Sequence, residues 1–165
     1  MENESHVVNR PFDANDEEPY IFVSYKHSDW RAVYSVIKRF NEAGFNIWYD
    51  AGLRRGKSYD IEIATHIKNA ELFITFITEK VIECSCDAND YLVMELSAAN
   101  HLRKNTLPIM LDESRLDGYY LMHYAGIKSI VRSHYGDDED LFIEDCLRAF
   151  EYDFGIKPVE READL

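Results

Sequence analysis

The chain has 165 residues, 46% of them hydrophobic, which suits one domain with one apolar core but not two domains. Its formal charge is -13 at pH 7, and no stripe of lysine and arginine interleaved with aromatics offsets it, so nucleic acid is a poor partner. The longest apolar runs, such as residues 72–77, are much shorter than a membrane span, and the polar start lacks a signal-peptide pattern. We therefore expect a cytoplasmic protein with no membrane partner.

The cysteines and histidines do not form a metal-binding or disulfide pattern. Cys84, Cys86 and Cys146 are too few and too irregularly spaced for a disulfide framework, and the C-x-C pair has no second cluster to complete a zinc site. The six histidines show no H-E-x-x-H or similar spacing. We expect reduced thiols, no metal and no bound cofactor.

Both ends of the chain differ in composition from its middle. Residues 1–19 are polar and acidic, with too little apolar content to pack alone, so we predict a flexible leader. Residues 158–165 have the same character and are predicted to be a flexible tail or linker. One domain is then expected over residues 20–157, and it contains no internal repeat.

In the first half of this domain, two apolar runs flank a helical pattern. Residues 20–25 and 45–49 are predicted strands. Between them, apolar side chains recur at i, i+3, i+4 and i+7, which predicts a helix capped by Ser28 or Asp29 and ended by Gly44 in a left-handed conformation. A loop with two glycines and three cations follows at residues 50–59.

The second half continues the alternation. Further strands are predicted at residues 71–78, 106–111 and 127–131, the first of them nearly continuously apolar and therefore the most deeply buried. Helices are predicted around Ile63, Ile67 and Ala70, over residues 91–102, and after Gly136, where an acidic run suits a helix N-terminus and Ile143, Leu147 and Phe150 are expected to be buried. Tyr119, Tyr120, Met122 and Tyr124 are most simply explained by core or surface packing.

Strands that alternate with helices are typical of an α/β protein. Five strands and about five helices predict a flavodoxin-like three-layer sandwich with a five-stranded parallel sheet. Ligands of such folds bind beyond the carboxyl ends of the strands, where residues 24–27, 49–59 and 78–95 should converge.

Two of these converging segments carry positive charge. Residues 24–27 offer a hydroxyl, an aromatic ring and a cation before a helix, which could face a phosphate or could simply form a capped turn with a solvated lysine. The cations of residues 50–59 could attract an anionic substrate or the acidic surface of a partner. The sequence Gly56-Lys57-Ser58 imitates the end of a P-loop, but the earlier glycine is missing, so a P-loop is excluded.

The third segment contains the most informative local feature, Glu95. Its i, i+4 spacing from Tyr91 places a ring and a carboxylate on the same helical face. Glu95 also borders the apolar stripe of this helix, so partial burial would tune its ionisation, as in many acid/base and cation-stabilising groups. The alternative is a boundary glutamate paired to a nearby cation.

Three short segments together resemble the signature of one family. Phe22-Val23-Ser24-Tyr25, then residues 44–50 (GFNIWYD), then Gly56-Lys57-Ser58 resemble the first two boxes of Toll/interleukin-1 receptor (TIR) domains, closest to the bacterial type. The resemblance extends over about residues 20–154. It implies a sheet of five parallel strands, in agreement with the count above.

The resemblance also implies an activity and a set of site residues. Catalytically competent TIR domains cleave nicotinamide from NAD+, and their glutamate lies on the helix after the third strand, usually four residues after a tryptophan. Glu95 occupies that place, with Tyr91 where the family usually has tryptophan. By resemblance, Glu95 is catalytic and NAD+ is the substrate. The resemblance also implies substrate-binding residues, which are Ser24, Tyr25 and Lys26 at the ribose and phosphates and Asp50, Gly56 and Tyr59 on the loop side. Tyr91 would support Glu95 or pack on the substrate.

The family further implies self-assembly with other TIR domains. Residues 50–59 would be the BB loop, with Leu53, Arg54, Arg55 and Lys57 as its assembly residues. The first hypothesis is therefore an NAD+ glycohydrolase or ADP-ribosyl cyclase of bacterial anti-phage immunity, activated by self-assembly. The second is a non-enzymatic TIR–TIR adaptor. A flavodoxin-like receiver or nucleotide-binding domain fits less well, because the first strand lacks the acidic cluster of a phospho-acceptor site.

Overall fold

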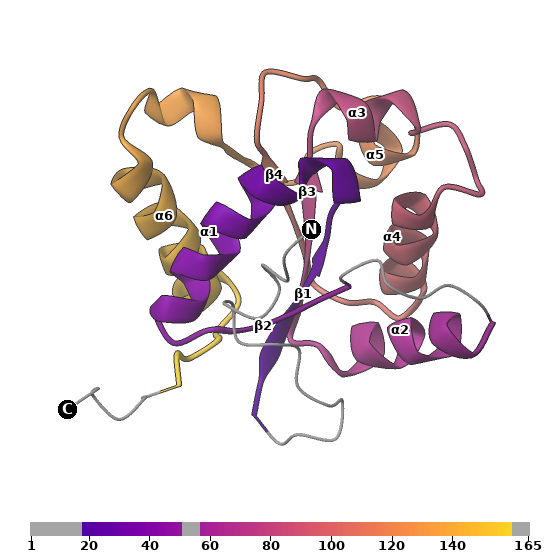
Figure 1. Ribbon diagram of the computed structural model, residues 1–165, viewed down its shortest axis with the longest axis horizontal. Coiled ribbons are helices and arrows are strands. Elements are labelled where there is room, and N and C mark those ends of the chain that lie inside the picture. The colour runs from indigo at the N-terminus through magenta and orange to yellow at the C-terminus, as the bar shows by residue number, and fades with distance from the viewer. Residues whose placement is uncertain (1–17, 51–56, 160–165) are drawn as a thin grey trace.

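A computed structural model describes residues 18–50 and 57–159, with side chains from residue 60 onward in the second range. The first 17 residues of the predicted leader and residues 160–165 of the predicted tail lie outside this part. Five parallel strands form one sheet in the order β2-β1-β3-β4-β5 (Figure 1). The strands are β1 (Tyr20–Ser24), β2 (Asn46–Tyr49), β3 (Leu72–Ile77), β4 (Thr106–Met110) and β5 (Ile130–Val131).

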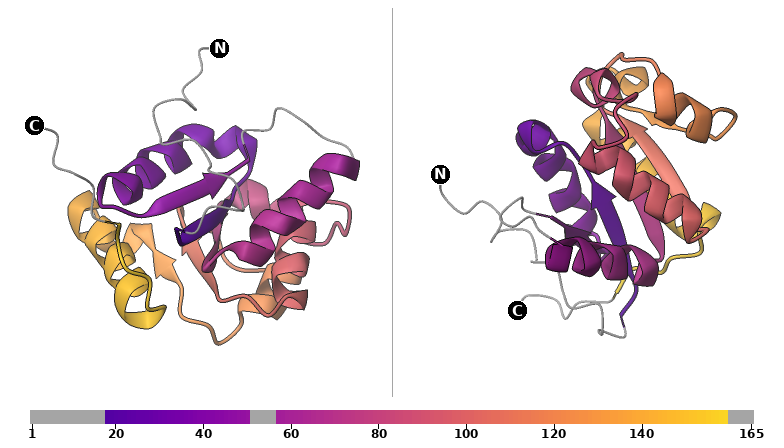
Figure 2. Two further views of the ribbon diagram at one scale, coloured as in Figure 1. Left: turned by 90° about the horizontal axis from the view of Figure 1, so that it is seen from below. Right: turned by 90° about the vertical axis from the view of Figure 1, so that its right-hand side faces the viewer.

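Helices cover both faces of the sheet, as Figure 2 shows. One face carries α1 (Trp30–Glu42) and α6 (Glu139–Arg148), while α2 (Lys57–Asn69), α4 (Tyr91–His101) and α5 (Gly118–Tyr124) lie on the other. Short helices η2 (His27–Asp29), α3 (Glu79–Glu83) and η3 (Arg132–Tyr135) connect these elements, and a π-helix, η4 (Ala149–Asp153), follows α6. The predicted three-layer sandwich with five parallel strands is therefore confirmed.

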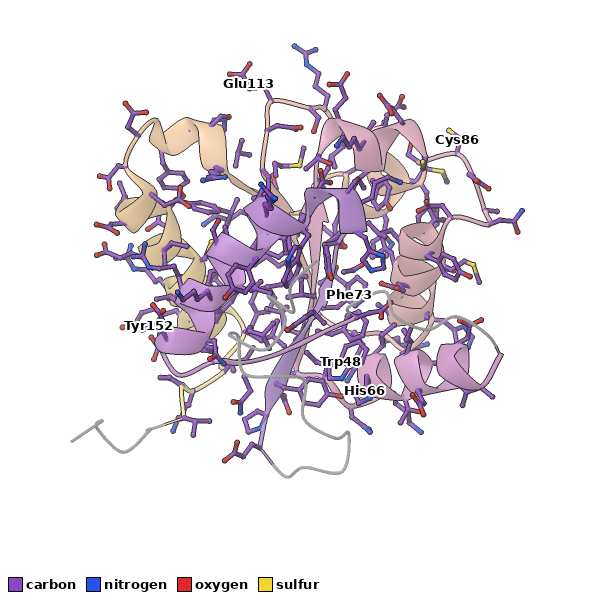
Figure 3. All side chains as sticks on the ribbon, viewed as in Figure 1. Trp48, His66, Phe73, Cys86, Glu113 and Tyr152 are labelled. Atoms are coloured by element: carbon purple, nitrogen blue, oxygen red, sulfur yellow. The ribbon has the colours of Figure 1, made fainter. Side chains whose placement is uncertain are left out.

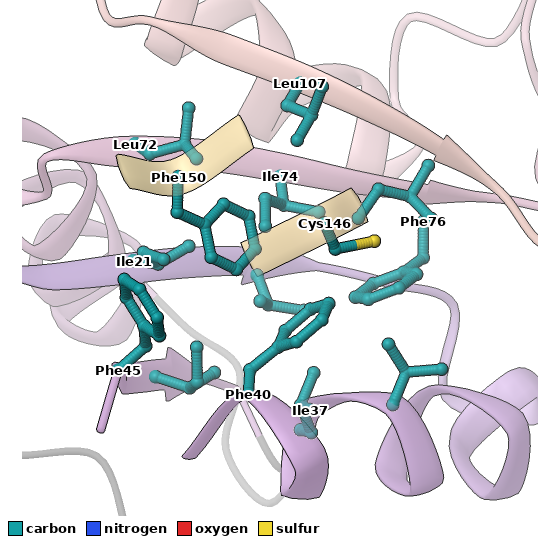
Figure 4. Close-up of a cluster of buried hydrophobic side chains, with 14 of the residues drawn as sticks. Ile21, Ile37, Phe40, Phe45, Leu72, Ile74, Phe76, Leu107, Cys146 and Phe150 are labelled. Atoms are coloured by element: carbon teal, nitrogen blue, oxygen red, sulfur yellow. The ribbon is translucent and has the colours of Figure 1, made fainter. Parts of the chain in front are cut away.

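Two apolar clusters, one on each side of the sheet, make up the core. Side chains of a strand point alternately to its two faces, so Ile21 and Val23 join the cluster under α1 and α6, while Phe22 joins the opposite cluster. Figure 4 shows the first cluster, where Phe40 and Phe150 meet edge to face with their ring centroids 4.9 Å apart. The central strand β3 has every side chain buried, as its continuous apolar run predicts.

Aromatic stacking ties β2 to α2 in the second cluster. The ring of Trp48 stacks on Phe22 at 4.9 Å and on His66 at 4.2 Å between centroids, and Figure 3 shows Trp48 and His66 side by side. This contact holds α2 against β2, which is the strand at one edge of the sheet.

The structure differs from the sequence predictions at several elements. Residues 127–129 do not belong to β5, which has only two residues, and the helices α3 and α5 were not predicted. The predicted side-chain cap of α1 is wrong, because the Asp29 carboxylate accepts a hydrogen bond from Thr78 instead of an amide of α1. Gly44 does follow α1 with a positive φ of 100°. Within residues 18–50 and 57–159, no helix is long and apolar enough to cross a membrane.

Gly118, at the start of α5, gives a test of this packing. Its φ is +54°, and a Cβ there would lie 2.5 Å from Ser85 Oγ and 2.8 Å from the Ser85 carbonyl oxygen. Gly118→Ala should cost about 1–2 kcal/mol for the left-handed backbone and about 1–3 kcal/mol more for crowding. Gly126→Ala is the matched control, because φ is +79° and the space around it is open. Equal losses in urea unfolding would show that the contact with Ser85 is not tight.

Candidate active site

A cavity of about 290 Å³ opens at the carboxyl edge of the sheet. The strand order places β1 between β2 and β3, so the chain leaves β1 and β3 toward opposite sides, and α/β proteins bind ligands at such a switch point. The upper edge of the sheet in Figure 1 is this carboxyl edge. The cavity is lined by Val23, Tyr25, Lys26, His27, Ser28, Asp50, Asp90, Tyr91, Leu92 and Glu95.

Strand alternation places Ser24 on the face of the sheet that α4 covers. Its neighbours Val23 and Tyr25 belong to the opposite cluster, under α1. The Ser24 hydroxyl, itself 1% exposed, donates a hydrogen bond of 2.8 Å to Oε1 of Glu95. One oxygen of the carboxylate is thereby held by the last residue of β1.

Helix α4 brings Glu95 to the cavity with its carboxyl group largely buried. Asp90 caps this helix, because its carboxylate accepts hydrogen bonds from the amides of Leu92 and Val93 at 3.1 and 3.2 Å. Tyr91 and Glu95, one turn apart, both line the cavity, as their i, i+4 spacing predicts. Tyr91 is 41% exposed, whereas Glu95 is 9% exposed, so the glutamate lies deep in the site and the ring lies near its mouth.

The opposite wall is built around Asp50, the residue after β2. The Tyr25 hydroxyl donates to the Asp50 carbonyl at 2.7 Å, and Nε2 of His27 lies 3.2 Å from the same oxygen. The carboxylate of Asp50 is 3.9 Å from that ring nitrogen. Asp50 is 6% exposed, so the loop after β2 starts from a backbone that side chains following β1 hold in place.

A further contact ties the connection after β1 to the connection after β3. Thr78, directly after β3, donates a hydrogen bond of 2.6 Å to the carboxylate of Asp29. Lys26 reaches the same region, where its ammonium donates to the Cys84 sulfur at 3.7 Å. These contacts fix the spacing of the two connections that flank the switch point.

The charges around the cavity are unequally distributed. The Lys26 ammonium follows β1, while the carboxylates of Asp50, Asp90 and Glu95 occupy the other walls. The ammonium is complementary to a phosphate of a ligand, and the carboxylates are complementary to a group of the same ligand that becomes positively charged. Among the described residues, no group of three or more histidine, cysteine, aspartate or glutamate side chains is placed to hold a metal ion.

The structure brings together six of the residues that the sequence singled out. Tyr25, Lys26, Asp50, Tyr91 and Glu95 line the cavity, and Ser24 contacts Glu95. Of the other predicted residues of the 50–59 loop, Leu53, Arg54, Arg55 and Gly56 lie outside the described residues, and so do the side chains of Lys57 and Tyr59.

Several residues of the cavity were not singled out from the sequence, although His27, Asp90 and Leu92 lie within the segments that were predicted to converge here. His27 and Ser28 extend the segment after β1, and Leu92 adds an apolar wall. Asp90 carried a usable signal, because an aspartate directly before a helix is a preferred cap.

The fold and the cavity define a flavodoxin-like α/β domain with its candidate site at the switch point of the sheet. A family model described as "TIR domain" matches residues 21–144. The chain therefore belongs to the TIR domain family.

Solved structures agree with this assignment at the level of the fold. The TIR domain of the Toll-related receptor TRR-2 from Hydra magnipapillata matches with a TM-score of 0.61 and 16% identity, covering 79% of this chain and 97% of that one. The RPS4 and RRS1 TIR domain heterodimer matches with a TM-score of 0.59 and 11% identity, covering 84% of this chain and 99% of that one. A comparison with curated proteins finds no match.

The contact between Ser24 and Glu95 predicts the effect of a small substitution. Ser24→Ala removes a donor from a buried carboxylate, so the free energy of unfolding should fall by about 1–3 kcal/mol. Ser35→Ala is a suitable control, because the Ser35 hydroxyl bonds to the Ala32 carbonyl on an exposed part of α1. Urea unfolding of both variants measures the difference, and equal stability of the two would contradict the structural role of the Ser24 hydroxyl.

Proposed function

We propose that this TIR domain is an NAD+ glycohydrolase or ADP-ribosyl cyclase that acts in bacterial anti-phage immunity. The observation that supports the proposal best is Glu95, a carboxylate 9% exposed that lines the cavity and is held by Ser24. A preplaced negative charge in a site with little water is the feature that such a reaction needs.

The proposed chemistry is cleavage of the bond between nicotinamide and its ribose. The bonding electron pair leaves with the nicotinamide nitrogen, which becomes neutral, and positive charge develops at the ribose C1′. The Glu95 carboxylate stabilises this charge, and because Ser24 already orients it, little reorganisation is required as the bond breaks. Water then attacks C1′ and releases a proton, which gives ADP-ribose. Attack by a nitrogen of the adenine gives a cyclic product instead.

The other walls of the cavity support binding of the same substrate. Lys26 is the cation nearest to the end of β1 and would face the phosphates. Tyr91, at the mouth, offers a ring on which nicotinamide can stack. The Asp50 side of the cavity would contact a ribose through hydrogen bonds to its hydroxyls.

Replacing the carboxylate tests the activity directly. Glu95→Gln keeps the size of the side chain but removes the charge, so nicotinamide release at high protein concentration should fall at least about 100-fold. Glu83→Gln, on an exposed residue at the end of α3, is the matched control and should release nicotinamide at the wild-type rate.

Two other outcomes would lead to different conclusions. Equal turnover by wild type and Glu95→Gln would remove Glu95 from the mechanism. Absence of turnover in the wild type, under conditions in which it self-associates, would favour the second candidate function, a non-enzymatic TIR–TIR adaptor.

We further propose that activity requires self-assembly through the loop of residues 50–59. Arg54→Glu reverses a charge in this loop and should lower both the associated fraction and the turnover per protomer. Lys128→Glu, which reverses an exposed charge between α5 and β5, is the control. Sedimentation velocity and nicotinamide release over a range of concentrations measure the two effects. Unchanged association of Arg54→Glu would exclude the arginine from the assembly surface.

A further inference from the structure

Helix α5 carries two buried tyrosines, and only one of their hydroxyl groups has a hydrogen-bond partner among the described residues. Tyr124 is 1% exposed, and its hydroxyl is 2.8 Å from Oγ1 of Thr75 on β3, within hydrogen-bond distance. Tyr120, one turn earlier, is 0% exposed, and its hydroxyl has no hydrogen-bond partner among the described residues. A buried hydroxyl without a partner is costly, so an acceptor or a buried water near Tyr120 is to be expected.

Tyr120 packs close to the helix that carries Glu95. It lies in the same apolar cluster as Leu92 and Leu96 of that helix, α4. Burial raises the pKa of the Tyr120 phenol, and the charges of Asp90 and Glu95 are among the neighbours that raise it further. The phenol therefore stays protonated, as a hydrogen-bond donor within electrostatic range of two carboxylates that line the cavity.

The start of α5 is fixed in place behind the cavity. The Tyr119 amide donates to the Ser85 carbonyl at 3.0 Å, and Gly118 lies so close to Ser85 that no Cβ would fit. Ser85 belongs to the segment between α3 and α4, which also contains Cys84, the partner of Lys26. Tyr120 is thus held by a connection that itself forms part of the site.

We propose that Tyr120 is a positioning residue of this site, whose hydroxyl donates a hydrogen bond to one buried water that in turn donates to the Glu95 carboxylate. Glu95 is the better acceptor of the two carboxylates, because Asp90 is half-buried and already accepts two amides of α4, whereas Glu95 is 9% exposed. The Ser24 hydroxyl and the Tyr120 hydroxyl together would hold the carboxylate in a fixed orientation.

The first test needs no activity. Glutamate labelled with ¹³C at the side-chain carboxyl is incorporated, and the Glu95 resonance is assigned by its loss in Glu95→Gln. A donor favours the charged form, so Tyr120→Phe should raise the midpoint of the Glu95 titration by about half a pH unit or more. The other titratable groups around the carboxylate stay the same: Asp90 and Tyr91 on α4, Lys26 and His27 after β1, Asp50 after β2, and Cys84 before α4.

Tyr124→Phe is the matched control, because it removes one hydroxyl from the same helix and the same cluster. We expect it to lower the midpoint of urea unfolding, since Thr75 loses its partner, and to leave the Glu95 titration unchanged. Tyr120→Phe should also lower the midpoint of urea unfolding, since it removes a donor that supports a buried carboxylate, so the Glu95 titration is the measurement that separates the two variants. An unchanged Glu95 midpoint in Tyr120→Phe, or an equal rise in both variants, would overturn the inference.

The consequence for catalysis rests on the proposed function. In nicotinamide release, Tyr120→Phe should lower kcat about tenfold, the effect of one hydrogen bond to a charged group, with KM changed less than about twofold. A raised Glu95 midpoint without turnover in the wild type would support the role of Tyr120 and contradict the proposed function. If the wild type cleaves NAD+, and Tyr120→Phe has the same kcat and the same Glu95 midpoint as the wild type, the proposed function is supported and the role of Tyr120 is contradicted.

Discussion

The hydrogen bond from Ser24 to Glu95 joins the end of β1 to α4, 71 residues along the chain. A carboxylate that is 9% exposed is unfavourable unless donors stabilise it, and the serine hydroxyl supplies one. The bond forms only if β1 ends at this residue and Ser24 points toward α4, which strand alternation decides. A shift of β1 by one residue would turn Ser24 away from Glu95, so the packing of β1 and the geometry of the site depend on each other.

The two apolar clusters explain why this edge of the sheet is well defined. Neighbouring residues of β1 belong to different clusters, so Ser24 and Tyr25 reach the two sides of the switch point from one short segment. Tyr25 then fixes the carbonyl of Asp50, and Ser24 fixes Glu95. Two walls of the cavity are therefore positioned by consecutive residues, each of them buried by a different layer of helices.

Much of the fold could be predicted from the sequence, because long apolar runs and helical periodicity reflect burial directly. Strand β3 and helix α4 were predicted within one or two residues of their observed bounds. Helix α3, with five residues, is too short to show a period, and only two residues of the predicted fifth strand pair with β4. The cavity was predicted in outline, whereas contacts such as that of Thr78 with Asp29 depend on tertiary packing, which no local pattern encodes. The i, i+4 spacing of Tyr120 and Tyr124 was a usable signal for α5.

The hydrogen bond between Thr78 and Asp29 has a consequence for ligand recognition. It links the connection after β1 to the connection after β3, so contacts within the protein organise this part of the rim. Binding to an organised rim loses less conformational entropy than binding that has to order a loop. Differences in affinity between ligands at this edge would then arise mainly from the contacts that each ligand makes, and a rigid-body description of its docking is appropriate there.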